Sequence, residues 1–499
     1  MIDKKKYIEI CNCCDFLLKD INSSIQTVSI SWLHIIREHP IVLNRYEKLF
    51  TYQNAMQKMK SWIALFVNYF RILNCLLRSI NNKTNIVELG NFESTSQIDY
   101  LFVSHLINEE QINSELDFYF ADVISNLDSE NYKTVTLLLN QTNISNSNLK
   151  KKYILKKRKI LLSKILNFKY EISFFFKLIK ERKLLNSKLQ HFKTKSLQFN
   201  VIKEAKRQCL SKSTFDNFRN YYHFKEVIAK YNPRNIVTTF EGHAWERMLF
   251  AAAKQHTLPI KCMAYHHTSL FRYQHSVLQK LNFPFNPDII LTTGQASKER
   301  FENSELGHER RIEILGSSRA KDVLLCESNI NKFKNSCIVI PEGIDSECIM
   351  LFRFSILCSK QAPNVNFIFK LHPIMSREVF VKKYPEFSYL PSNVKWASDN
   401  SKSYFSESKW VLYRGTTMIV QACYAGLIPF YYQSHPEEMT IDLLHEVSNY
   451  KITLRNVNDF LTSISSIKNI NFDRDKVMNY CASLYSRFDH NILIRELNY

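Results

Sequence analysis

The sequence predicts an α/β protein built from two Rossmann-like, doubly wound domains. Short apolar segments typical of buried strands alternate with longer helical patterns between about residues 98 and 440. Turn-forming residues gather in the same part of the chain, because seven of the eight glycines lie at 242–426 and eleven of the twelve prolines at 233–436. Strands that alternate with helices form parallel sheets with helices on both faces.

Residues 1–92 are predicted to be a mainly helical extension, since they contain almost no turn-forming residues. The clearest helix in this extension is expected at Ala55–Asn81. No run of 18 uncharged apolar residues occurs, and charged residues interrupt the first twenty positions. We therefore expect neither a signal peptide nor a membrane span, and a cytoplasmic protein.

The first domain is predicted at 93–325. Its strands are expected at Ile98–Ser104, Thr134–Leu139, Asn235–Phe240, Ile260–Tyr265, Asp288–Thr292 and Arg311–Leu315. Its helices are expected at Glu115–Leu127, about 214–230, Ala244–Gln255 and Ser297–Phe301.

A basic helical insert is predicted within this domain at 150–190. Residues 150–183 contain thirteen lysines and arginines against two glutamates, which is more than half of the chain's net charge of +20. Apolar residues between Ile160 and Ile179 recur at near-helical spacing among these lysines. Such a helix either lies on an anionic membrane surface or is simply solvated, and both interpretations stay open.

The second domain is predicted at 336–499, after a polar segment. Its strands are expected at Cys337–Ile340, Asn366–Leu371, Trp410–Tyr413 and Ile428–Tyr431, and its helices at Ser346–Gln361, Arg377–Lys383 and Thr417–Ala425. Ligands of such sheets bind at the carboxyl ends of the strands, so a cleft between the two domains is the expected site.

The first candidate site residues follow a predicted strand of the first domain. Phe240 is followed by Glu241, Gly242 and His243, and a helix begins at Ala244. Gly242 allows a sharp turn that exposes the Glu241 carboxylate, so Glu241, with His243 beside it, is the candidate catalytic base. The structural alternative is that one of these side chains caps the helix.

Two strand ends of the second domain supply the next candidates. His372 stands at the tip of an apolar strand, where Pro373 sets the turn and the imidazole is placed to bond a phosphate or ribose oxygen. Glu342 and Gly343 end another strand, so the carboxylate and the glycine amide are expected to face the same ligand.

A third strand of this domain leads into Arg414, Gly415, Thr416 and Thr417. A guanidinium, two hydroxyls and the amides of a helix N-terminus suit a phosphate or diphosphate. An ordinary helix cap with a solvated arginine is the alternative.

Four further residues end strands of the first domain and are candidates for binding an acceptor. They are Ser104, His105, His266 and His267. Helix capping or core packing is the alternative for each of them.

These motifs carry a resemblance. With His372-Pro373 at a strand tip, the acidic Glu241-Gly242 turn and the later Gly415-Thr416 turn, the chain resembles GT-B fold glycosyltransferases of bacterial surface-carbohydrate assembly. The first two motifs are similar to those of bacterial polysialyltransferases and capsule Kdo transferases, which use CMP-activated sugars. Glycerophosphotransferases that use CDP-glycerol share the His-Pro tip. Those families carry an acidic pair where this chain has Phe240 and Glu241.

The resemblance, which covers roughly residues 98–440, implies roles for the motif residues. Glu241 would be the general base on an acceptor hydroxyl, His372 would bind the cytidylyl phosphate, and Arg414 to Thr417 would surround it. Retaining members carry two glutamates eight residues apart after the phosphate turn, and no such pair lies between residues 414 and 438, which favours an inverting single displacement. No Asp-x-Asp ends a strand and the twelve cysteines lack zinc-like spacing, so neither a metal nor a separate cofactor is expected.

The function expected from the sequence is transfer of a CMP-linked ulosonic sugar, of the Kdo or sialic type, to a surface polysaccharide or glycan. The enzyme would be cytoplasmic, with residues 150–183 as a possible contact to the inner face of the membrane. A CDP-glycerol-type transferase, a UDP-sugar transferase and an epimerase-type enzyme are the alternatives. Nucleic-acid binding by residues 150–183 is a remote one and is not expected, because that segment has no recognisable binding module.

Overall fold

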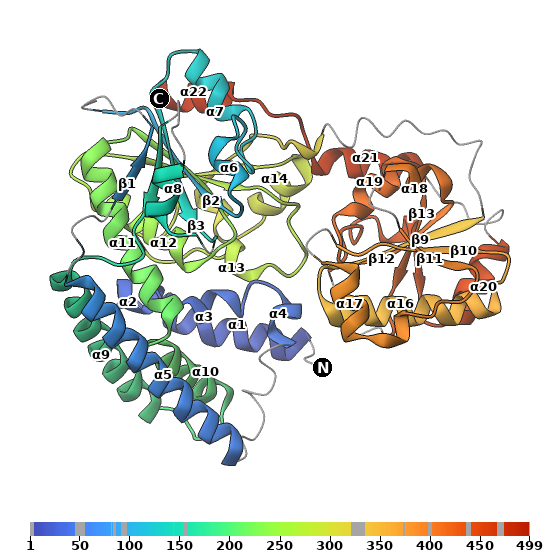
Figure 1. Cartoon of the computed structure of the whole chain (residues 1–499), viewed down its shortest axis with the longest axis horizontal. Helices are drawn as coiled ribbons and strands as arrows, with labels where there is room; N and C mark the ends of the chain where they lie inside the picture. The colour runs from blue at the N-terminus through green and yellow to red at the C-terminus, as the bar shows by residue number, and fades with distance from the viewer. Residues whose placement is uncertain are drawn as a thin grey trace.

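In the computed structural model, the chain forms two α/β domains and a group of helices packed beside the first (Figure 1). The structure describes residues 4–44, 55–80, 82, 86–90, 97–142, 144–152, 158–320, 335–372, 375–397, 402–435, 441–466 and 474–498.

The first domain is built on an eight-stranded sheet with the order β1-β4-β3-β2-β5-β6-β7-β8, in which only the β1–β4 pair is antiparallel. Its strands are β1 (Ile86–Leu89), β2 (Tyr100–Leu106), β3 (Thr134–Asn140), β4 (Lys159–Leu162), β5 (Asn235–Thr239), β6 (Lys261–His266), β7 (Ile289–Thr292) and β8 (Arg311–Ile314). The six strands predicted for this domain are all present. Their central residues are buried on both faces, as a parallel sheet between helices requires.

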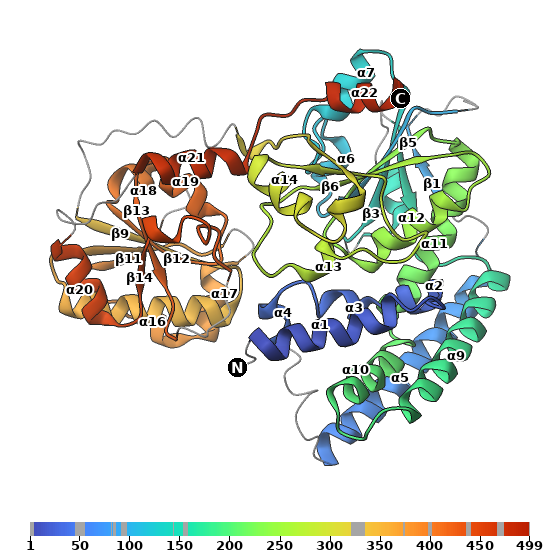
Figure 2. The same ribbon diagram turned by 180° about the vertical axis from the view of Figure 1, so that it is seen from behind.

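Helices cover both faces of this sheet (Figures 1 and 2). They are α6 (Glu110–Asn113), α7 (Val123–Ser129), α8 (Asn146–Lys152), α11 (Lys212–Tyr231), α12 (Ala244–Lys254), α13 (His275–Leu278) and α14 (Gln295–Glu302). The predicted helix Glu115–Leu127 is wrong over its first half. Its Asp117 carboxylate accepts hydrogen bonds from the amides of Tyr119 and Phe120, and this local turn replaces the helix.

The second domain has a six-stranded parallel sheet with the order β11-β10-β9-β12-β13-β14. Its strands are β9 (Ser336–Pro341), β10 (Asn366–Phe369), β11 (Val394–Trp396), β12 (Trp410–Arg414), β13 (Ile428–Tyr432) and β14 (Ile452–Leu454). Its helices are α16 (Asp345–Gln361), α17 (Arg377–Lys383), α18 (Lys402–Glu407), α19 (Met418–Tyr424), α20 (Val457–Ser466) and α21 (Arg474–Leu484). The prediction of two doubly wound α/β domains is confirmed.

The remaining helices form a region that projects from the first domain (Figures 1 and 2). They are α1 (Lys4–Leu18), α2 (Ile25–Val28), α3 (Ser31–Ile35), α4 (Pro40–Asn44), α5 (Ala55–Ser79), α9 (Phe168–Gln190) and α10 (Leu197–Gln208). Helix α9 begins at Phe168 because the Asn167 side chain accepts a hydrogen bond from the Tyr170 amide and caps the first turn.

The basic insert predicted at 150–190 is therefore only partly helical. Residues Lys159–Leu162, expected on an amphipathic helix, form strand β4 inside the first sheet, with β3 on one side and β1 on the other. The four residues are buried, and two neighbouring strands satisfy their backbone groups better than a solvated helix would. Strand β1 also adds residues 86–89 of the predicted helical extension to this sheet.

The chain returns to the first domain at its C-terminal end. After α21, which packs against α14, helix α22 (Asn491–Asn498) lies on the first domain. Leu493 is fully buried there among Tyr100 and Phe102, and the Tyr100 hydroxyl donates to the Leu493 carbonyl oxygen at 2.8 Å. None of the helices in the described ranges is long and apolar enough to cross a membrane.

Candidate active site

Each sheet contains one strand with later strands of the chain placed on both of its sides, which makes a topological switch point. In the first sheet β3 and β4 extend from one side of β2, and β5 to β8 from the other. In the second sheet β10 and β11 extend from one side of β9, and β12 to β14 from the other. Ligands of open α/β sheets bind at the carboxyl ends of the strands beside such switch points. The predicted site residues lie at or just after the carboxyl ends of β2, β5 and β6 in one domain and of β9, β10 and β12 in the other.

Glu241 lies directly after β5, beside the switch point of the first sheet. Gly242 turns the chain with a φ of +81°, and α12 begins two residues later. One Glu241 carboxylate oxygen lies 3.5 Å from Nε2 of His267, and the other lies 3.7 Å from Nδ1 of His243. The structure thus gathers three residues that the sequence predicted separately.

Charges and burial around Glu241 move the pKa values of this group of side chains. Burial raises the pKa of Glu241, while the positive charge of His243 lowers it. Burial acts to lower the pKa of His243, but the Glu38 hydrogen bond and the charges of Glu241, Glu246 and Glu38 outweigh it and raise the value to about 10. His243 is therefore a cation near neutral pH, and it holds a carboxylate suited to act as a base.

Glu246 explains why Glu241 and His243 have this orientation. Its carboxylate accepts hydrogen bonds from the backbone amides of Glu241 and His243, each at 2.8 Å, and so caps the start of α12. His243, for which the sequence allowed a capping role, is the N-cap residue of α12, and Glu246 completes a capping box with it. Both predicted side chains remain only partly buried.

A pocket of about 520 Å³ lies beside this carboxylate. It is lined by Glu241, His243 and His105, and also by Tyr119 and Trp245. The ring of His105 lies edge-to-face with Trp245 at 5.1 Å and with Tyr119 at 5.9 Å, and the Tyr119 ring is 4.6 Å from that of His267. Aromatic faces beside polar groups are suited to a sugar ring.

Several residues of this pocket were not found by sequence reasoning. Trp245 could have been predicted, because it follows the Glu241 motif directly. Tyr119 could not, because it lies in the segment wrongly predicted as a helix. The N-terminal helices add Ser31 and Ile35 to the lining, and Glu38 lies 3.5 Å from Nε2 of His243. No local pattern marks these three residues, because the fold alone brings them to the site.

Two of the predicted acceptor-binding residues are turned away from the pocket. Ser104 is fully buried, and its hydroxyl donates to the Asp117 carboxylate at 3.1 Å. His266 is also fully buried, with its ring edge-to-face with Phe301 at 5.5 Å. Successive strand residues point to opposite faces, so His266 faces the core while His267 reaches Glu241. Of the four residues predicted to bind an acceptor, His105 lines the pocket and His267 lies 3.5 Å from Glu241.

The predicted donor-binding residues lie at the ends of three neighbouring strands of the second sheet. His372 follows β10, Glu342 follows β9 and Gly415 follows β12. A Cβ added to Gly415, whose φ is +74°, would crowd a Glu342 carboxylate oxygen at 3.1 Å and would sit on a strained left-handed backbone. Burial raises the pKa of Glu342 to about 7, against the effect of the Gly343 amide, which hydrogen-bonds the carboxylate.

The side chain of Arg414 does not take part in this arrangement. It is buried, and its guanidinium pairs with the Glu347 carboxylate of α16 and donates to the Tyr432 carbonyl oxygen at 3.3 Å. A buried arginine needs such a partner, which corrects the prediction that this guanidinium reaches a ligand.

The residues after Arg414 form a short turn. The Thr416 side chain accepts a hydrogen bond from the Met418 amide at 3.3 Å, and Thr417 precedes α19 without a side-chain cap bond. Pro373, also predicted to contribute here, lies outside the described residues.

Arg319 is a cation that the sequence analysis did not select. It follows β8 in the run Gly316-Ser317-Ser318-Arg319, and its Nη1 donates to the Tyr485 hydroxyl at 3.2 Å. Its positive charge helps burial to lower the pKa of His267 in the first domain and of His372 in the second. Arg319 therefore lies where the two domains approach each other. The sequence pattern that could have identified it is Gly316, a glycine directly after a predicted strand.

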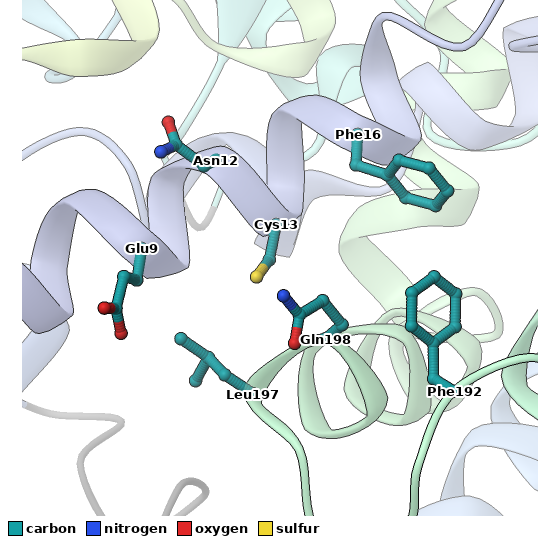
Figure 3. Close-up of a pocket in the computed structure, with 7 residues that line it drawn as sticks. All are labelled: Glu9, Asn12, Cys13, Phe16, Phe192, Leu197 and Gln198. Carbon is teal, nitrogen blue, oxygen red and sulfur yellow. The ribbon is translucent and has the colours of Figure 1, made fainter.

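A separate pocket of about 510 Å³ lies between α1 and the start of α10, and among the described residues that line it Glu9 is the one charged side chain (Figure 3). Burial raises the pKa of Cys13 in this pocket to about 11, so the thiol is protonated near neutral pH. The pocket is distant from the carboxyl ends of both sheets, and we assign it no chemistry. Within the described part of the chain, no three His, Cys, Asp or Glu side chains are grouped as a metal ion requires.

Searches with the sequence find no matching family model and no matching curated protein. Solved structures do show similarity. UDP-GlcNAc 2-epimerase from Methanocaldococcus jannaschii aligns with 81% of this chain and 100% of its own, at 11% identity and a TM-score of 0.45. The enzyme from Neisseria meningitidis bound to UDP-GlcNAc aligns with 80% and 99%, at 11% identity and 0.44. A GtfA/B complex aligns with 57% and 60%, at 12% identity and 0.35.

Proposed function

We propose that this protein is a nucleotide-sugar-dependent glycosyltransferase that uses Glu241 as its general base. The observation that carries the proposal is the position of Glu241 at the switch point of the first sheet, between His243 and His267 and beside the 520 Å³ pocket. The second half of the site is the group of strand ends that carries His372, Glu342 and Gly415.

In this proposal the pocket beside Glu241 holds an acceptor hydroxyl. Glu241 removes the hydroxyl proton while the oxygen attacks the anomeric carbon, and the bond from that carbon to the leaving phosphate breaks in the same step. The electron pair of this bond leaves with the phosphate. His372 hydrogen-bonds the phosphate, and Arg319 takes over the positive charge that was predicted for Arg414.

The nucleotide is the open part of the proposal. The resemblance of the motifs suggests CMP, whereas a UDP-sugar is the alternative, and UDP-GlcNAc is bound in the Neisseria meningitidis structure named above. An epimerase-type reaction is the second candidate. An epimerase needs no acceptor molecule, so the presence of a pocket beside Glu241 favours a transfer reaction over epimerisation.

A thermal-shift panel with CMP, CDP, UDP, GDP and ADP tests the proposal, because a ligand that binds only the folded state raises the melting temperature. We expect one pyrimidine nucleotide to stabilise the protein, by about 3 kcal/mol at a hundredfold excess over its Kd. This stabilisation should be lost in His372→Ala and kept in His435→Ala, a change at another histidine of the same domain. No response to any of the five nucleotides would contradict the proposal.

A further inference from the structure

Helix α5 exposes an unusual number of large apolar side chains. Trp62 and Phe66 are each 73% exposed, and Phe70 is 64% exposed. These residues belong to a set that recurs every three or four positions and therefore occupies one side of the helix. The exposed set is Met59, Trp62, Ile63, Phe66, Val67, Phe70, Leu73 and Leu77, followed by Ile80 just beyond the helix.

This stripe is not the side by which α5 packs on the protein. Leu65, Tyr69 and Leu76 pack against the main hydrophobic core on one side of the helix, together with the buried Ile72. The stripe thus remains uncovered along about 30 Å of helix, at the usual rise per residue. Monomeric proteins rarely expose a continuous apolar patch of this size without a partner.

The charged residues of α5 and the exposed charged residues of the neighbouring α9 are of one sign. Helix α5 contains no acidic residue. The two acidic residues of the neighbouring α9 are turned inward, because Glu171 pairs with Arg219 and Glu181 accepts from Ser24 and Thr27. The exposed charged residues of α9 are therefore all basic: Lys169, Lys177, Lys180 and Lys183.

We propose that α5, together with the basic side of α9, is a docking surface for an anionic lipid bilayer. The helix would lie in the plane of the membrane with its apolar stripe at the level of the lipid headgroups and its neighbouring lysines on the lipid phosphates. A second copy of the chain fits this surface less well, because two such surfaces would bring like charges together.

The position of α5 relative to the candidate active site is consistent with this docking. A third side of the helix, with Arg71 and Arg78, lines a cavity of about 690 Å³. This cavity shares Gln141 and Asp216 with the pocket beside Glu241. If the proposed function holds, an acceptor carried by the bilayer would approach Glu241 along these two adjoining pockets.

Sedimentation of the purified full-length protein with vesicles tests the docking, without nucleotide so that its result is independent of the proposed function. Vesicles of phosphatidylcholine and phosphatidylglycerol should bind the protein, and vesicles of phosphatidylcholine alone should bind it more weakly. The triple variant Trp62→Ser, Phe66→Ser, Phe70→Ser should lose about tenfold or more in affinity, since it removes the aromatic side chains that would be buried at the headgroup level.

A matched control replaces three exposed apolar residues away from α5, in the variant Leu258→Ser, Val379→Ser, Tyr389→Ser. It should bind anionic vesicles as the wild type does, and circular dichroism should show both variants folded. Absence of wild-type binding, or equal binding by the α5 variant, would overturn the proposal. A dimer in analytical ultracentrifugation that the α5 variant abolishes would also overturn it, because the surface would then be an interface between copies.

Discussion

Glu241 shows how a single carboxylate acquires a chemical role from its surroundings. Its neighbour His243 is held as a cation by Glu38, Glu241 and Glu246, with a pKa of about 10. On its other side is His267, whose pKa burial keeps well below the ordinary value, so that this imidazole is neutral. A carboxylate between a cationic and a neutral histidine can accept a proton while the two imidazoles keep it oriented.

At this scale we predict the effect of Glu241→Gln. The amide keeps the shape of the carboxylate but cannot accept a proton, so turnover should fall by about 10²- to 10⁴-fold while nucleotide binding is retained. Because burial raises the pKa of Glu241, the activity of the wild type should increase with pH through a pKa above the ordinary 4.5 of a glutamate.

Steady-state hydrolysis of the donor that the thermal-shift panel identifies, measured from pH 4 to pH 9, checks both statements. Glu299→Gln, at an exposed position of α14, is the control and should behave as the wild type. Normal turnover in Glu241→Gln would remove Glu241 from the role of base.

At the scale of elements, the site depends on the turn that joins β5 to α12. Gly242 adopts a φ of +81°, and a Cβ at this position would lie 2.6 Å from the carbonyl carbon of Ser276. The N-terminal helices support the same turn, because Nδ1 of His34 lies 3.2 Å from the Gly242 carbonyl oxygen. The helical region thus supports the turn that carries the candidate active site.

We predict that Gly242→Ala lowers the free energy of unfolding by about 2–5 kcal/mol, from left-handed strain and overlap with backbone atoms that cannot move easily. Urea denaturation followed by circular dichroism measures this loss. Ser213→Ala, an exposed position in the first turn of α11, should change the stability by less than about 0.5 kcal/mol. A similarly small effect of Gly242→Ala would show that the turn is not constrained.

At the scale of the whole molecule, the two domains are joined by contacts that lie far apart in the sequence. Gly294 and Gly316 approach the backbone of Ser483 and Arg487 so closely that neither has room for a Cβ. Arg300 pairs with Glu446, and Ser269 donates to the Tyr485 hydroxyl at 2.7 Å. Helix α22 completes the junction by packing on the first domain.

We therefore predict that Leu493→Ala destabilises the first domain, although residue 493 follows the second domain in sequence. The fully buried side chain leaves a cavity beside Tyr100 and Phe102, which costs about 2–5 kcal/mol. Arg495→Ala, on the exposed side of the same helix, is the control. Limited proteolysis with mass spectrometry should show the first domain cleaved earlier in Leu493→Ala only, and equal cleavage of both variants would contradict the prediction.

The sequence by itself determined the two doubly wound domains and the positions of Glu241, His372 and Gly415. These features follow from local patterns, namely short buried strands that end in glycine-containing turns. Such patterns can be recognised from consecutive residues alone.

Only the tertiary structure decided which charges remain for a ligand and which segments are covered. Arg414 is paired with Glu347, 67 residues away, and Glu38 reaches His243 from the N-terminal helices. Strand β4 joined the sheet because β1 and β3 flank it, and the stripe on α5 stayed uncovered because no other described helix packs on it. Burial and charge pairing depend on partners distant in the chain, and the order of residues within one segment does not identify those partners.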